Sequence, residues 1–128
     1  MNKNMHLLAA LSQQLNVDLQ LESGVCALFD SHDQEVCVIE LLPQGSSAVL
    51  HCAIDIPHPV SEHYRRLLTL NFQPDMLHGC WLALDEGDTV RLCAQCPVEL
   101  LTERTFCQWV IGFIEQVADT RLLLDQPA

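Results

Sequence analysis

The stretch "CWLALDEGDTVRLCAQCPVELLTERTFCQWVIGFIEQVADTRLLL", residues 80–124, places a β-hairpin directly before a long helix. Its two apolar runs, 80–85 and 89–96, flank the turn "EGD", and this arrangement predicts two short strands joined by a tight turn. The helix that follows is the strongest periodic signal in the chain, and Thr102 is its expected N-cap. One apolar stripe with 3-4 spacing defines the helix: Phe106, Trp109, Val110, Phe113, Ile114 and Val117.

The sequence before this stretch predicts two further helices and three further strands. The segment 73–79 breaks the second helix. We expect the elements in this order: a helix over 4–16, strands over 25–29, 35–42 and 48–56, and a helix over 57–72. The complete order is helix, three strands, helix, two strands, helix. It predicts one α+β domain over 1–128, with helices packed on a twisted, mainly antiparallel sheet.

The charge of the chain excludes two classes of partner. Seventeen acidic residues against six basic ones give a net charge of −11, whereas nucleic acids and anionic membranes require clustered Lys and Arg. No apolar run reaches the roughly 18 residues of a membrane span. The N-terminus turns polar without a small-residue cleavage site, so we expect no signal peptide and a cytoplasmic protein.

The predicted strands are apolar on both faces. In the second strand Val36 and Val38 alternate with Cys37 and Ile39, so neither face of the strand is polar. Such strands need cover on both faces, and three helices would struggle to provide it. We therefore expect a second copy or another protein to cover the remainder. The alternative that the sheet curls and buries its own second face stays open.

The pair Cys93-x-x-Cys96 raises the question of redox or metal chemistry. An odd separation on a strand puts the two sulfurs on opposite faces, where they cannot form a disulfide. A helix beginning at residue 97 would instead place Cys96 at an N-cap, but the apolar stripe favours the start at Thr102. Zinc would need four ligands, and "HGC" (78–80) is the only nearby source. We expect no metal and no cofactor, and a small zinc or thiol protein using Cys80, Cys93 and Cys96 remains the rival hypothesis.

No arrangement in the sequence indicates an enzyme. The five glycines are isolated, so there is no phosphate-binding loop, and no serine lies in a nucleophile-elbow context. The acidic cluster at 85–88 lies in a two-strand turn, where acidic residues are common. We therefore predict a binding protein without catalytic residues.

The element order and several local patterns resemble the class I type III secretion chaperones, the Tir-chaperone-like family. The resemblance runs from about residue 5 to 124 and rests on "LESGVCALFD" with "EVCVIEL" for the first hairpin. It continues through "LLTLNF" (67–72), similar to the family's Leu-Asn helix end. The hairpin with its acidic turn, the strand running into a proline and the closing amphipathic helix complete it. The high cysteine content and the single lysine depart from the family pattern.

This resemblance implies a homodimer that binds the N-terminal segment of a secreted effector in extended form. It further implies a role that keeps the effector soluble and competent for secretion in the bacterial cytoplasm. Carried onto this sequence, the client groove is expected to involve Leu7, Leu8, Val25, Leu28, Val36, Val38, Leu50 and Ile54. The dimer interface is expected to involve Leu67, Leu68, Trp81, Ala83, Val90 and Leu92. An acidic regulator that sequesters a basic protein is a further alternative.

Overall fold

A computed structural model describes residues 2–42, 45–56 and 61–125 and has the predicted alternation of helices and strands. The elements are α1 (Lys3–Leu15), β1 (Val25–Phe29), β2 (Glu35–Glu40), β3 (Ser47–Ala53), α2 (Ser61–Asn71), α3 (Pro74–Leu77), β4 (Trp81–Leu84), β5 (Val90–Pro97), the 3-10 helix η1 (Val98–Leu100) and α4 (Glu103–Asp125). The α+β class predicted from the sequence is confirmed.

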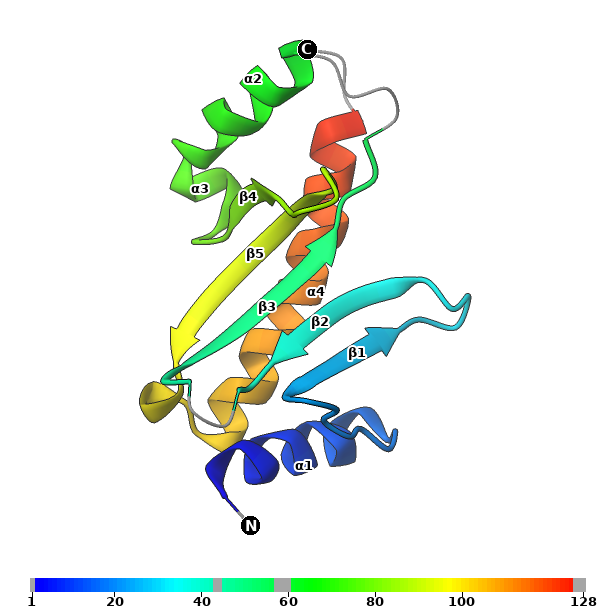
Figure 1. The fold of residues 1–128 in the computed structure, drawn as a ribbon, viewed down its shortest axis with the longest axis vertical. Coiled ribbons are helices and arrows are strands. Elements are labelled where there is room, and N and C mark those ends of the chain that lie inside the picture. Colours follow the sequence, from blue (N-terminus) through cyan, green and yellow to red (C-terminus); the bar gives the residue numbers. More distant parts are fainter. Residues whose placement is uncertain (1, 43–44, 57–60, 126–128) are drawn as a thin grey trace.

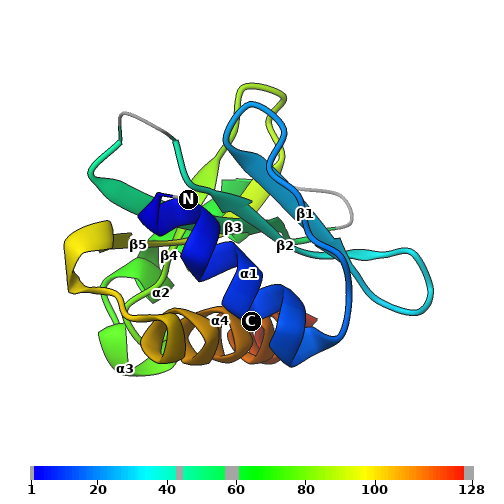
Figure 2. The ribbon, with the colours of Figure 1, turned by 90° about the horizontal axis from the view of Figure 1, so that it is seen from below.

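The five strands form one antiparallel sheet in the order β1-β2-β3-β5-β4. The long helix α4 runs along one face of this sheet and α1 packs beside it (Figures 1 and 2). No helix of the described residues covers the opposite face, which we call the open face (Figure 2). Within the described residues, helices therefore cover the sheet on one side only.

The hydrophobic core lies between the sheet and α4. In β3, Ala48, Leu50 and Cys52 are buried, while the residues that alternate with them are partly exposed. From α4, the side chains of Phe106 and Val110 are completely buried against this layer. The buried face of β3 and the buried face of α4 thus pack against each other, and this contact fixes the orientation of both elements.

The helix α4 begins where the sequence predicts. The Thr102 hydroxyl accepts a hydrogen bond from the Thr105 backbone N–H at 3.1 Å, the geometry of an N-cap. The strand β5 runs to Pro97, so Cys93 and Cys96 both lie on a strand. The predicted stripe is also confirmed, because its members are buried or pack against the core.

Several boundaries differ from the prediction. The segment 73–79 contains the short helix α3, because Pro74 suits a first helical turn and His78 ends it in a left-handed conformation. Strands β2 and β3 end two to three residues before the apolar runs do. Just beyond these ends, a backbone hydrogen bond still joins each chain segment to its neighbour. Leu41 N–H donates to the Gly24 carbonyl, and Ile54 N–H donates to the Val90 carbonyl. Residues 57–60 of the predicted second helix lie outside the described residues.

Candidate functional site

The open face carries a charged network that joins three strands and a turn. Arg91 on β5 donates to Asp85 Oδ2 at 2.8 Å and to Glu35 Oε1 at 3.4 Å. Its Nη1 also donates to His51 Nδ1 at 3.2 Å, so that nitrogen accepts and the imidazole proton lies on Nε2. His51 Nε2 then donates to Glu40 Oε2 at 3.0 Å. The open face is therefore more polar than the apolar runs of the sequence suggested.

This network was missed at the level of sequence because its members are far apart along the chain. Arg91 and His51 are 40 residues apart, although strand register brings β3 and β5 side by side. The alternation of residues along each strand was the one indication in the sequence, because both residues alternate with buried apolar residues and so point outward. The Arg91 hydrogen bond is the main cause that lowers the pKa of Asp85, and backbone N–H donors in the turn contribute further.

The cysteines form neither a disulfide nor a metal cluster in the described residues. Cys93 pairs with Trp81 and His51 across neighbouring strands on the open face, whereas Cys96 packs toward the core. Burial, with a smaller contribution from Cys93, raises the pKa of Cys80 to about 11. Burial also raises the pKa of Cys93, against the opposing charge of Arg91. Both thiols are therefore protonated at neutral pH and are weak nucleophiles.

A groove of about 780 Å³ lies between α1 and the segment that leads into β1. Its lining is mixed apolar and amide: Asn2, Asn4, Met5, Leu8, Ala9, Leu19, Gln20, Leu21, Ser23, Gly24 and Leu41. Gly24 has a φ of +81°, and a Cβ there would lie 2.9 Å from the side chain of Leu42. Glycine thus allows the chain to turn closely against Leu42 beside this groove, which we call the α1 groove.

The two edges of the sheet differ in whether another strand can pair with them. At β4, the Asn71 side chain accepts from Leu82 N–H at 2.8 Å and donates to Leu82 O at 3.0 Å. An asparagine at the end of α2 thereby occupies the outer hydrogen-bonding groups of this edge strand. At β1, Glu22 bridges Val25, and no other described segment pairs with the outer edge. The β1 edge beside the α1 groove is therefore the edge that is open to another strand.

A second set of exposed apolar side chains lies on and between α2, α3 and β4, which group together at the upper left of Figure 1. We call it the α2–β4 surface. Its large side chains are 37–78% exposed, unusually high for apolar residues on adjacent elements. Its members are Leu68, Phe72, Met76, Trp81 and Leu84. Phe72, Met76 and Leu84 were not identified from the sequence, where they resemble ordinary core positions.

The structure divides the predicted client residues into two groups. Val25 and Val36 are partly exposed, and Val38 is 8% exposed on the open face. Leu8 is 5% exposed and lines the α1 groove, and the remaining four are buried in the core: Leu7, Leu28, Leu50 and Ile54. These side chains are buried because they point toward α4 or lie on the inner face of α1. The alternation of residues along the sequence does not show which face a helix covers.

The predicted dimer residues divide in the same way. Leu68 is 69% exposed, and Trp81 and Ala83 are exposed on β4. Leu67, Val90 and Leu92 are buried in the core of the chain. Leu68, Trp81 and Ala83 thus lie on α2 and β4, the elements that also carry the α2–β4 surface.

The Tir chaperone protein (CesT) family model matches residues 6–121, and the chain belongs to this family. Its family and fold are those of a chaperone. No curated protein matches the sequence at a significant level. No helix among the described residues is long and apolar enough to cross a membrane.

Several solved structures share the fold. A chain of the HopA1–SchA chaperone–effector complex has a TM-score of 0.76 at 19% identity, with 93% of each chain covered. A chain of the ExsC–ExsE complex has a TM-score of 0.79 at 19% identity, covering 97% of this chain and 96% of that one. A chain of the ExoT–SpcS complex from Pseudomonas aeruginosa has a TM-score of 0.65 at 15% identity, covering 94% and 98%.

Proposed function

We propose that this protein is a cytoplasmic, non-catalytic chaperone that binds the N-terminal segment of a type III secreted effector in extended form. Bound in this way, the effector stays soluble and competent for secretion. The observation that carries the proposal is the open β1 edge beside the α1 groove. An extended segment can add main-chain hydrogen bonds to such an edge and place alternate side chains in the groove.

Membership of the Tir chaperone family supports this function, and the solved relatives include chaperones in complex with effectors. The apolar side chains at the groove also support it. Met5 is 50% exposed and Leu42 is 47% exposed, so both present apolar surface next to the edge strand. Phe29, at the end of β1, is 57% exposed.

The α2–β4 surface supports a homodimer. Two chains that pack this surface together would bury the same residues twice, as a two-fold interface requires. Because Asn71 occupies the outer groups of β4 at Leu82, the contact would be made by side chains rather than by a continuous ten-stranded sheet. The client surface at α1 and β1 lies at the other end of the molecule and stays free (Figure 1).

Co-expression with the N-terminal segments of effectors from the same genome tests the chaperone function. We expect a wild-type complex that survives gel filtration and a weaker complex with Met5→Asp, which places a charge at the groove. Leu122→Asp is the matched control, because Leu122 is 65% exposed on α4, outside the groove. Equal loss in both variants, or no complex with any effector segment, would contradict the proposal.

A further inference from the structure

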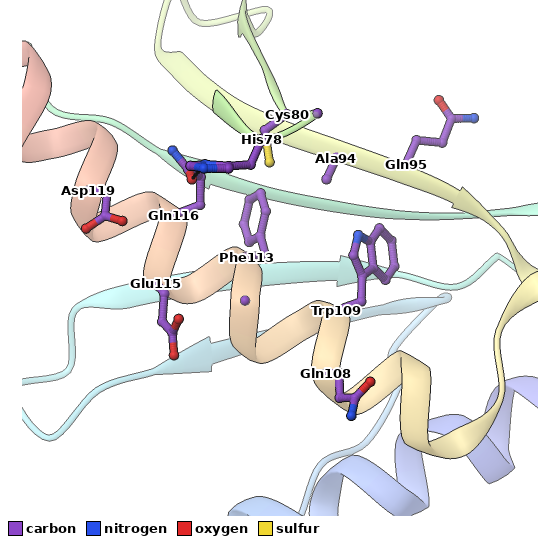
Figure 3. A pocket seen from close by; sticks show the side chains of 12 residues that line it. His78, Cys80, Ala94, Gln95, Gln108, Trp109, Phe113, Glu115, Gln116 and Asp119 are labelled. Carbon is purple, nitrogen blue, oxygen red and sulfur yellow. Dashed lines mark hydrogen bonds between the residues drawn. The ribbon is translucent and has the colours of Figure 1, made fainter. Parts of the chain in front are cut away.

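A pocket of about 570 Å³ opens between α4 and the turn that connects α3 to β4 (Figure 3). We call it the α4 pocket. It is lined by twelve residues, which include Trp109, Gly112, Phe113, Glu115 and Asp119 from α4. It is separate from both the α1 groove and the α2–β4 surface, whose lining residues it does not share.

One wall of the pocket is fixed by a buried amide. Gln116, 7% exposed, donates from Nε2 to Met76 O at 3.2 Å and to Thr120 Oγ1 at 3.0 Å. Its Oε1 lies 2.6 Å from His78 Nδ1, so the imidazole N–H donates to it. These bonds tie α3 and the turn after it to α4, and the pocket is therefore formed before any ligand binds.

The floor of the pocket is apolar and has an unoccupied position. Phe113 is buried beneath the floor, and Trp109 is half-buried, with its ring centroid 6.4 Å from that of Phe106. Between them Gly112 is exposed, and a Cβ added there would meet nothing within 4 Å. Neither packing nor backbone conformation requires this glycine, which is a poor residue for a helix interior. Its effect is to leave room above the helix next to the indole.

The pocket is acidic at one end. Glu115 and Asp119 are exposed on α4 one helical turn apart, and both line the pocket at the end away from Trp109 (Figure 3). No Lys or Arg lines the pocket, and within the described part of the chain neither carboxylate makes an ion pair or a side-chain hydrogen bond. The two carboxylates favour a cation at this end, whereas Trp109, at the other end of the pocket, offers a ring face to an aliphatic chain (Figure 3).

We infer that the α4 pocket binds an arginine side chain carried on an apolar segment of the client protein. The inference rests on the proposed function and adds a second anchor point on the same client. The aliphatic stem packs over Gly112 beside the Trp109 indole, and the planar guanidinium lies between Glu115 and Asp119, which are one helical turn apart. Arginine fits better than lysine because the N–H groups of its planar guanidinium can donate to two carboxylates at once.

The test uses the two tryptophans of the chain as reporters. In protein labelled with 5-fluorotryptophan, a Trp81→Phe variant assigns the two ¹⁹F signals, and the Trp109 signal then reports on the pocket. The probe is a 12-residue amphipathic peptide with leucines on one face and one central arginine. Its partner is the same peptide with citrulline, which keeps the shape and removes the charge.

We expect the arginine peptide to shift the Trp109 signal and to bind at least about tenfold more tightly than the citrulline peptide, a difference of about 1.4 kcal/mol. Glu115→Gln with Asp119→Asn should abolish this preference, whereas Glu99→Gln, an exposed control outside the pocket, should retain it. Gly112→Leu fills the open position with a better helix former, so it should keep the melting temperature while blocking both peptides.

Three results would overturn the inference. One is equal binding of the two peptides, and another is a Trp109 signal that responds to neither. A signal that moves on dilution of the protein alone would show that a second copy fills the pocket. Failure of the inference is distinguishable from failure of the proposed function. If an effector segment binds the Gly112→Leu variant as tightly as it binds wild type, the inferred arginine site is wrong, whereas the proposed chaperone function stands.

Discussion

Replacing Leu68 by serine should dissociate the proposed homodimer without weakening the fold of each chain. Leu68 is 69% exposed, so the described chain obtains little stability from its side chain. Complete burial of a leucine contributes about 1.5–3 kcal/mol, and burying this exposed part would contribute about 1–2 kcal/mol per chain. A two-fold interface counts the residue twice, for a total of about 2–4 kcal/mol per dimer.

This free energy corresponds to a dimer dissociation constant that rises by roughly 30- to 700-fold. Sedimentation velocity over a range of concentrations measures that constant directly. Leu100→Ser is the matched control, because Leu100 is also 69% exposed but lies on η1, away from the α2–β4 surface. A Leu68→Ser protein with an unchanged dissociation constant, or a control that dissociates equally, would refute the reasoning.

Three further outcomes follow from single side chains. Asn71→Ala leaves the N–H and C=O of Leu82 unpaired, so the free energy of unfolding in urea should fall by about 1–3 kcal/mol; no measurable loss would contradict the edge-strand account. The lowered pKa of Asp85 stabilises the fold above its unfolded pKa of about 3.9, and this contribution disappears as the pH falls through the folded value. Asp85→Asn should therefore lower the melting temperature at pH 7 and have little effect near pH 2; an equal loss at both would contradict this. Gly24→Ala forces an alanine into a left-handed conformation against Leu42, so the free energy of unfolding in urea should fall by about 1–2 kcal/mol or more. An unchanged free energy of unfolding would show that the close approach to Leu42 does not require glycine.

The order of elements was predictable because each one carries a strong local signal. The stripe from Phe106 to Val117 could only be one face of a helix, and Thr102 was the residue suited to cap it. The strand β5 was equally clear, and its alternation correctly separated Cys93 from Cys96. Local patterns of this kind depend on neighbours a few residues away, which a sequence displays directly.

The binding surfaces were less predictable because exposure depends on which face a distant helix covers. Leu50 and Val49 are both apolar, but only Leu50 faces α4 and becomes buried. The charged network around Arg91 and His51 depends on strand register, which no local pattern specifies. Phe72, 78% exposed, could be recognised as surface only after the short helix α3 had been placed.

The most direct test of the account is amide hydrogen exchange on the purified complex of this protein with an effector N-terminal segment, with native mass spectrometry to give its stoichiometry. We expect two chaperone chains for one effector segment, and exchange protection that appears at the β1 edge and the α1 groove when the segment binds. We also expect the segment to be protected in short extended stretches rather than as a cooperative globule. An effector segment that remains globular on the chaperone, or protection that leaves β1 and α1 unchanged, would contradict the central claim.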